Sequence, residues 1–408
     1  MIIKKRFKFK CEKAVVNMND IDKNKYIGFM IDEALRELEC QGILSRSIKE
    51  FLKKNILRRS VSKEDMIRWP QGMLLLGLSC AGETDTVCDY FDKWIESGAE
   101  VTSLEDVLAG QVMLKTVLGK SNKAYFYMKY CDKIASFLSS YKRDEEGSLP
   151  YNVKALNEHI YADSIGMVCP FLMMYGFYTG EQKYADMALL LIDNFMKNAM
   201  DEVTGLPYHG YRYKEHEKYG IIGWGRATGW LMMGMSGCLN TVRAFASEVQ
   251  NDSARSEERT ELVTKRGLIL SNIKEHIKDL KEYYDRLSDT VIRYQRADGL
   301  WGWNLEDDES QTDTSASAMI LYAFSQFAPN SIVKEMTTAC DANINTDSQD
   351  IQSMKRGIAG VSRYITSSGK VMQCQAECGG FGIYPEKFGS YPWSVGMTLA
   401  FMAEIKEL

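Results

Sequence analysis

Two aspartates precede or begin apolar segments, where a carboxylate can do chemistry. Asp163 begins the apolar part of the stretch 161–180, and Asp106 precedes a second apolar stretch that ends near residue 118. Two carboxyl groups that face one cavity repel each other, and one of them is pushed toward its protonated form near neutral pH. A protonated carboxyl group is the requirement for a general acid. We therefore predict Asp163 and Asp106 as the catalytic residues.

A purely structural alternative applies to Asp163. The residue stands where the N-cap of a helix would stand, and an aspartate there accepts backbone N–H bonds at the head of the helix. The sequence alone leaves both interpretations open.

Aromatic and polar side chains gather in glycine-containing turns that lead into the apolar stretches. His209 lies in such a turn, VTGLPYHGY, and the chain has only four histidines. Sugar-binding sites combine aromatic faces, which stack on sugar rings, with polar groups that form hydrogen bonds. We predict the following substrate-binding residues: His209, Trp224, Arg226, Trp69 and Trp301. The alternative is that the aromatic rings plug the ends of the fold, which the sequence does not exclude.

Two kinds of predicted helix alternate along the chain. One kind is amphipathic and charged; it covers 20–57 (two helices), 85–98, 122–141, 181–200, 256–295 and 350–367. The other kind is apolar and rich in small residues and methionine; it covers 71–81, 106–118, 163–178, 225–239, 314–327 and 393–405. Helices that are apolar all round are buried, and helices with one apolar face lie outside them. The alternation predicts an all-α fold with an inner and an outer ring of six helices each, an (α/α)6 barrel.

We expect one domain over the whole chain, 1–408. Residues 1–60 are predicted to supply N-terminal outer helices, and the polar window 245–262 is predicted to form an exposed excursion. The internal period of roughly 60 residues is longer than that of ordinary solenoid repeats. Polar capping repeats, which a straight solenoid needs at its ends, are not recognisable in the sequence.

The composition argues against several classes of protein. The net charge is −5 and the sequence pI about 5.7, whereas a nucleic-acid-binding protein favours a basic stripe. No run is long and apolar enough to span a bilayer, and the basic start lacks the apolar core of a signal peptide. We predict a cytoplasmic protein without a nucleic-acid or membrane partner. The oligomeric state stays open.

The ten cysteines are scattered, mostly within apolar helical segments. This distribution favours buried reduced thiols over a disulfide framework. Cys374 and Cys378 form a CxxxC pattern, but no histidine stands near them in the sequence. Because the usual ligand spacing and partners are missing, we do not expect a zinc site there.

Three segments resemble a known enzyme family. WGRATGW (224–230) is similar to the WGRxxGW signature of glycoside hydrolase family 105, the unsaturated rhamnogalacturonyl hydrolases, which are related to the unsaturated glucuronyl hydrolases of family 88. The block that begins at Asp163 and contains Pro170 resembles the segment around that family's catalytic aspartate. DGLW (298–301), followed by DTSASAM (313–319), is also typical of the family. The resemblance extends over roughly residues 65–405 and implies an (α/α)6 barrel.

The resemblance also implies an activity. Such enzymes remove a terminal 4,5-unsaturated uronic acid, left by a polysaccharide lyase, by hydrating its C4=C5 double bond. Asp163 matches the family's acid/base aspartate, and Asp106 matches the second active-site aspartate in a looser block, with Glu105 beside it. His209, Trp224, Arg226 and Trp230 match pocket residues, and Arg226 is a candidate for contacting the uronate. The substrate implied is an unsaturated oligosaccharide, with no metal or organic cofactor.

Two other functions fit the same fold. An ordinary glycosidase with two carboxylates would act directly at the anomeric carbon and would cleave saturated substrates. A catalytically silent glycan-binding protein would keep its biological activity when Asp163 is changed to Asn. The residues Ala227 and Thr228 depart from the Gly-Asn that many relatives carry, so the sequence does not name the aglycone.

Overall fold

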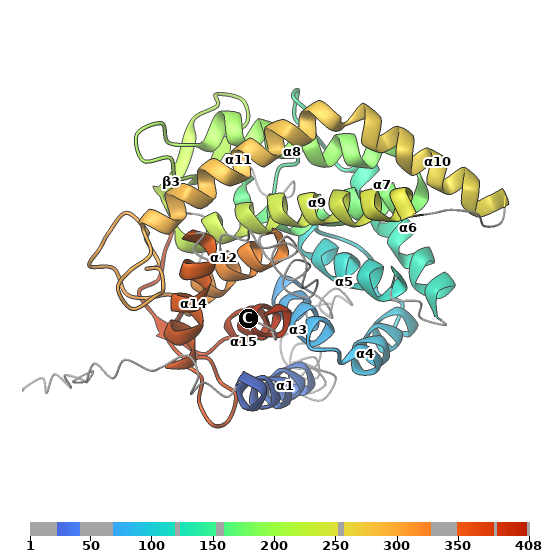
Figure 1. Cartoon of the computed structure of the whole chain (residues 1–408). Helices are drawn as coiled ribbons and strands as arrows, with labels where there is room; N and C mark the ends of the chain where they lie inside the picture. Colours follow the sequence, from blue (N-terminus) through green and yellow to red (C-terminus); the bar gives the residue numbers. More distant parts are fainter. Residues whose placement is uncertain are drawn as a thin grey trace, which may run out of the picture.

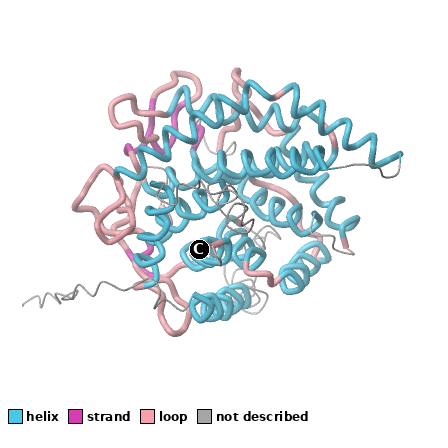
Figure 2. The backbone as a smooth tube through the Cα atoms, in the orientation of Figure 1, coloured by secondary structure: helices cyan, strands magenta, loops and turns pink. Residues whose placement is uncertain are grey.

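The computed structural model describes residues 23–40, 68–118, 123–151, 159–251, 257–327, 349–378 and 382–405, and the account below concerns these residues. Helix is the dominant secondary structure, with a few short strands in the loops (Figure 2).

Six helices form a closed inner ring (Figure 1). They are α3 (Trp69–Cys80), α5 (Val107–Leu118), α7 (Ala162–Thr179), α9 (Gly225–Asn251), α12 (Thr314–Phe327) and α15 (Pro392–Glu404). Each packs against the next in this order, and α15 packs back against α3, which closes the ring.

The outer helices lie against the inner ring. They are α1 (Lys23–Cys40), α4 (Thr84–Glu96), α6 (Ala124–Ser140), α8 (Gln182–Ala199), α11 (Lys274–Arg293) and α14 (Gln349–Ser362), and α10 (Glu257–Asn272) also packs against α9. Five of the six follow an inner helix along the chain and cover it. The first, α1, contacts both α15 and α3 and so covers the place where the chain's last inner helix meets its first. The predicted (α/α)6 barrel is confirmed.

The burial of α7 explains why the inner helices carry almost no charge. All residues from Ser164 to Phe177 are buried, and Asp163 in the first turn is only partly so. Apolar side chains on every face of such a helix are removed from water by its neighbours, which stabilises the ring. The outer helix α8 instead alternates buried and exposed residues along its length, as an amphipathic helix does.

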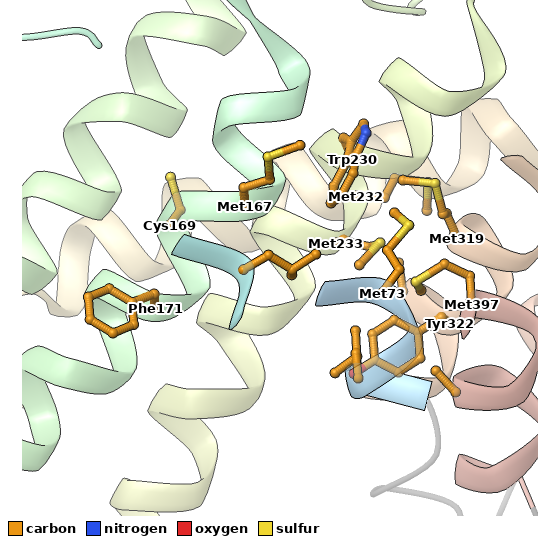
Figure 3. Close-up of a cluster of buried hydrophobic side chains, with 14 of the residues drawn as sticks. Met73, Met167, Cys169, Phe171, Trp230, Met232, Met233, Met319, Tyr322 and Met397 are labelled. Atoms are coloured by element: carbon orange, nitrogen blue, oxygen red, sulfur yellow. The ribbon is translucent and has the colours of Figure 1, made fainter. Parts of the chain in front are cut away.

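Small residues let the inner helices approach closely. A Cβ atom on Gly77 of α3 would lie 2.4 Å from the carbonyl oxygen of Gly396 on α15, and a Cβ on Gly396 would lie 2.4 Å from that of Met73. Only glycine fits at such a backbone contact. Methionines fill much of the space inside the ring, among them Met73, Met167, Met319 and Met397 (Figure 3). Their flexible side chains suit the irregular gaps between helices.

Two small antiparallel sheets lie in the loops. The first contains β1 (His159–Tyr161), β2 (Tyr208–Arg212) and β3 (Lys218–Ile222), with Tyr161 opposite Gly210. The second pairs β4 (Cys374–Gln375) with β5 (Phe388–Gly389). Strand β1 runs directly into α7, so the first sheet fixes where that helix begins.

Some predicted boundaries differ from the structure. The helix predicted at 225–239 continues to Asn251, and the one predicted at 256–295 is two helices, α10 and α11. The window 245–262, predicted as an exposed excursion, therefore contains the end of α9 and the start of α10, with 252–256 outside the described residues. Of the N-terminal segment 1–60, only α1 is described. Within the described residues, none of the helices is long and apolar enough to cross a membrane.

Candidate active site

A cavity of about 130 Å³ opens where several inner helices begin. Its walls are formed by Trp69, Glu105, Tyr151, Asp163, His209, Trp224, Arg226, Trp230, Glu377 and Cys378. Trp69, Asp163 and Arg226 lie in the first turns of α3, α7 and α9, so the inner helices point their N-termini to the same end of the barrel. Six of the predicted site residues line this cavity.

Two larger hollows, of about 480 and 450 Å³, lie along the outer helices α8 and α11. They contain none of the predicted site residues, and both are open to solvent on the outside of the ring. We therefore place the candidate active site in the smaller cavity.

Asp163 directs its carboxylate into the cavity. The helix begins at Ala162 with Tyr161 as its N-cap, so Asp163 is not the cap. Its side chain is 16% exposed, and Oδ2 lies 3.2 Å from Nε2 of His209. A partly exposed carboxyl group with a hydrogen-bonded histidine beside it can give up and take back a proton.

His209 lies on β2 and is buried between aromatic rings. Its side chain is 2% exposed, and its ring centroid is 4.6 Å from that of Tyr161 and 4.4 Å from that of Trp224. Its second nitrogen, Nδ1, lies 3.0 Å from the hydroxyl of Tyr384. The imidazole ring is thus held at both nitrogens.

The structure differs from the prediction for Asp106. That side chain is 3% exposed, and its Oδ2 accepts hydrogen bonds from the backbone N–H groups of Thr102 (2.8 Å) and Ser103 (2.9 Å). Asp106 is therefore the N3 residue of a capping box, with Ser103 as the N-cap, at the short 3₁₀ helix η2 (Leu104–Asp106) that leads into α5, and it does not line the cavity. The capping geometry uses the carboxylate that the sequence pattern assigned to catalysis.

Glu105, the neighbour of Asp106, supplies a second carboxyl group to the cavity. Its Oε1 accepts a hydrogen bond of 3.2 Å from the hydroxyl of Tyr151. Burial raises the pKa of Glu105, and the nearby carboxylates of Asp106 and Glu377 act in the same direction. Arg68 and the Tyr151 hydroxyl oppose this shift. Adjacent residues point in different directions on a helical turn, so the sequence alone could not decide which of the two acids faces the cavity.

Arg226 faces the cavity and also holds a loop in place. It is 2% exposed, and its guanidinium donates hydrogen bonds to the carbonyl oxygens of Gln375 (2.8 Å) and Ala376 (2.9 Å). It also lies 3.5 Å from the buried carboxylate of Asp313, which itself accepts a bond from the N–H of Gln375. This network fixes strand β4, from which Glu377 and Cys378 reach the cavity.

The tryptophans divide into two groups. Trp69 and Trp230 meet edge to face with centroids 6.3 Å apart, and with Trp224 they give the cavity its aromatic surface. Trp301, predicted to bind substrate, is instead fully buried away from the cavity, and its indole N–H donates to the carbonyl of Val291 at 2.8 Å. It packs against Phe324 inside the fold, in agreement with the alternative that it plugs the barrel.

Sequence reasoning did not identify Glu105, Tyr151, Glu377 and Cys378 as site residues. Glu377 and Cys378 come from the segment between β4 and β5, far along the chain from α7, and the CxxxC pattern of Cys374 and Cys378 does not point to a sugar site. Cys374 and Cys378 are both free thiols. Among the described residues, no cluster of three or more His, Cys, Asp or Glu side chains could hold a metal ion.

The sequence was compared with those of known families. The model of the family described as Glycosyl Hydrolase Family 88 matches residues 46–408. This chain belongs to glycoside hydrolase family 88. The resemblance to families 105 and 88 is thereby confirmed, and the chain is a hydrolase.

Relatives of this family 88 chain extend over nearly its whole length. It is 25% identical, over 365 residues, to the unsaturated rhamnogalacturonyl hydrolase YesR of Bacillus subtilis (strain 168), covering 86% of this chain and 92% of the relative. Its fold is similar to a possible member of family GH105 from Salmonella enterica, with a TM-score of 0.68, 16% identity and coverage of 96% and 95%. It is also similar to the unsaturated glucuronyl hydrolase from Bacillus sp. GL1, with a TM-score of 0.60, 14% identity and coverage of 94% and 97%.

Proposed function

We propose that this hydrolase removes a terminal 4,5-unsaturated uronic acid from lyase-generated oligosaccharides by hydrating the C4=C5 double bond. The observation that carries the proposal is the carboxyl group of Asp163, which faces an aromatic cavity and is hydrogen-bonded to the buried His209. Family membership and the named activity of the relative at 25% identity support the same reaction.

In this mechanism Asp163 acts first as an acid and then as a base. Its protonated carboxyl group gives a proton to C4, and the positive charge that develops at C5 is shared with the ring oxygen. A water molecule attacks C5 and returns a proton to the Asp163 carboxylate. The hemiketal that results collapses, the ring opens and the aglycone leaves. One water is consumed, and Asp163 ends in its starting protonation state.

The remaining residues bind and orient the sugar. Trp69, Trp224 and Trp230 offer aromatic surface for the sugar ring. Arg226 brings a positive charge to the cavity wall, which favours the uronate carboxylate. The carboxyl group of Glu105, whose pKa is raised by burial, lies on the cavity wall where it can form a hydrogen bond with a sugar hydroxyl.

The aglycone sugar and the cellular location are two further proposals. Rhamnose from rhamnogalacturonan is the first aglycone to test, because the relative at 25% identity is named for it. The cytoplasmic location remains a prediction from the composition of the chain.

The decisive experiment follows the ultraviolet absorbance of the conjugated alkene in a panel of lyase-generated disaccharides. The panel contains rhamnogalacturonan, glycosaminoglycan and heparin products, each with its saturated counterpart. We expect absorbance to fall with at least one unsaturated substrate and no cleavage of its saturated partner. An ordinary glycosidase would cleave the saturated partner. Constant absorbance across the whole panel would contradict the proposal.

A further inference from the structure

Three side chains from distant parts of the sequence form a hydrogen-bonded row. Oδ2 of Asp163 on α7 lies 3.2 Å from Nε2 of His209 on β2, and Nδ1 of His209 lies 3.0 Å from the hydroxyl of Tyr384. Tyr384 belongs to the loop between β4 and β5 and does not line the cavity. It therefore contacts the reacting carboxyl group only through the imidazole ring.

The ring of Tyr384 is held independently of its hydroxyl group. It stacks on Trp303 with centroids 6.2 Å apart and an interplanar angle of 30°, and it lies 5.3 Å from the ring of Trp224. Gly220 makes room for the hydroxyl, because a Cβ there would lie 2.5 Å from that oxygen and 2.6 Å from Cβ of His209. With φ at +82°, Gly220 also has a conformation that favours glycine. A phenylalanine at position 384 would thus keep the packing and lose only the hydrogen bonds.

The protons of the row can be assigned from what each group is able to donate. An ionised Asp163 carboxylate only accepts, so the neutral imidazole must carry its proton on Nε2. Nδ1 is then an acceptor and needs a donor. The Tyr384 oxygen accepts the backbone N–H of Ile221 at 3.3 Å, and burial raises the pKa of this tyrosine, so the hydroxyl keeps its own proton to donate.

We propose that Tyr384 is a positioning residue that holds His209 as the Nε2–H tautomer. His209 then donates to Oδ2 of Asp163 in both charge states of the carboxyl group, and Oδ1 is left to carry the proton that reaches C4. The assignment of this proton transfer rests on the proposed function, whereas the tautomer itself does not. The second nitrogen of a histidine commonly sets the tautomer in this way.

Loss of the hydroxyl has a defined consequence. Without a donor at Nδ1, the imidazole of His209 can carry its proton on Nδ1 instead. Its Nε2 then faces Asp163 without a proton. The carboxyl proton is then drawn to Oδ2, away from the substrate, and the Asp163 carboxylate loses a donor. Because a hydrogen bond to the charged form of a carboxyl group favours that form, losing one favours the protonated form. The rate needs protonated Asp163, so its decline at high pH moves to higher pH.

The other groups around Asp163 stay the same in such a variant. The titratable or charged side chains that share its cavity are Glu105, Tyr151, His209, Arg226, Glu377 and Cys378. Apart from His209, none of them forms a hydrogen bond with the Tyr384 hydroxyl in the described part of the chain, so a shift of the alkaline limb reports on the row itself.

The kinetic test compares Tyr384→Phe with Tyr283→Phe. The hydroxyl of Tyr283 donates to Asp193 at 2.8 Å between outer helices, so the control also loses one side-chain hydrogen bond of a tyrosine, at a distance from the cavity. For Tyr384→Phe we expect kcat to fall about 10- to 100-fold with KM nearly unchanged, as for other partners that fix a histidine tautomer. We also expect the alkaline limb of the pH–rate profile to move upward. Tyr283→Phe should leave both unchanged.

The tautomer can be read without any substrate. Nitrogen-15 NMR of the imidazole rings, with His209 assigned by its loss in His209→Gln, should show a protonated Nε2 and a bare Nδ1 in the wild-type protein and a changed state in Tyr384→Phe. A protonated Nδ1 in the wild-type protein would overturn the proposal, as would a fall in kcat with an unmoved alkaline limb. If no unsaturated substrate reacts, the proposed function fails while the NMR result still decides the tautomer.

Discussion

At the scale of single residues, two of the three carboxyl groups that line the cavity differ in their surroundings. Asp163 has a histidine as its hydrogen-bond partner, whereas Glu105 is hydrogen-bonded to Tyr151 and has its pKa raised by burial. Two carboxyl groups with such different surroundings can take different tasks in one site. Burial of the Glu105 carboxyl group also lowers the free energy of unfolding at neutral pH, which can be measured.

Glu105→Gln is expected to stabilise the protein at neutral pH. In the unfolded chain, a glutamate ionises around pH 4.5. In the folded protein, the raised pKa of Glu105 keeps its carboxyl group protonated to a higher pH. The folded state then binds more protons than the unfolded state, so wild-type stability falls as pH rises above 4.5 through the folded pKa. Glutamine has no carboxyl group to ionise at this position, so Glu105→Gln does not lose stability in this way. Thermal unfolding should give a higher melting temperature for Glu105→Gln than for the wild-type protein at pH 8, but not at pH 4.

The control for this prediction is Glu386→Gln, an exposed residue on the hairpin that carries Glu377. It should not reproduce the pH-dependent difference. An equal effect of Glu105→Gln at both pH values would contradict the role given to burial.

At the scale of elements, close packing between helices depends on glycine. Gly396→Ala would place a Cβ 2.4 Å from the carbonyl oxygen of Met73, so α15 and α3 would have to separate. We expect a loss of about 1–3 kcal/mol in the free energy of unfolding, as for other overpacked sites. Gly28→Ala on α1, where nothing lies within 4 Å, should instead be neutral or stabilising by up to about 1 kcal/mol. Denaturant unfolding of both variants checks this, and equal stabilities would contradict it.

Helix identity was predictable from the sequence, and the site only in part. The apolar, small-residue character of 163–178 and 314–327 reflects burial on all sides, which the structure confirms. Asp163 and His209 were predicted from their places at a helix start and in a turn, and both line the cavity. Tyr384 and Glu377 were not predicted. They lie between β4 and β5, and this segment comes close to α7 only when the ring of helices is closed. Asp106 and Trp301 were assigned by type and spacing, which do not reveal the direction of a side chain.

At the scale of the whole molecule, α1 covers the place where α15 meets α3 and closes the ring. This helix packs against both α15 and α3, and its Met30 is fully buried. Met30→Ala is expected to cost about 2–5 kcal/mol, as for other large-to-small core changes. If the ring unfolds as a unit, tryptophan fluorescence and helix circular dichroism should still report one transition at a lower denaturant concentration. Asp32→Ala, on an exposed face of the same helix, is the control.

A separate early transition in Met30→Ala, seen by circular dichroism alone, would show that α1 unfolds without the ring. That result would contradict the view that the N-terminal helix is part of the closed barrel.

The central claim is that Asp163 delivers a proton to an alkene carbon. The most direct measurement is the rate of alkene absorbance loss for Asp163→Asn against the wild-type enzyme, with the fold of the variant verified by circular dichroism. The account predicts a rate at least about 100-fold lower, as for loss of a general acid. An Asp163→Asn enzyme that destroys the alkene at nearly the wild-type rate would contradict it.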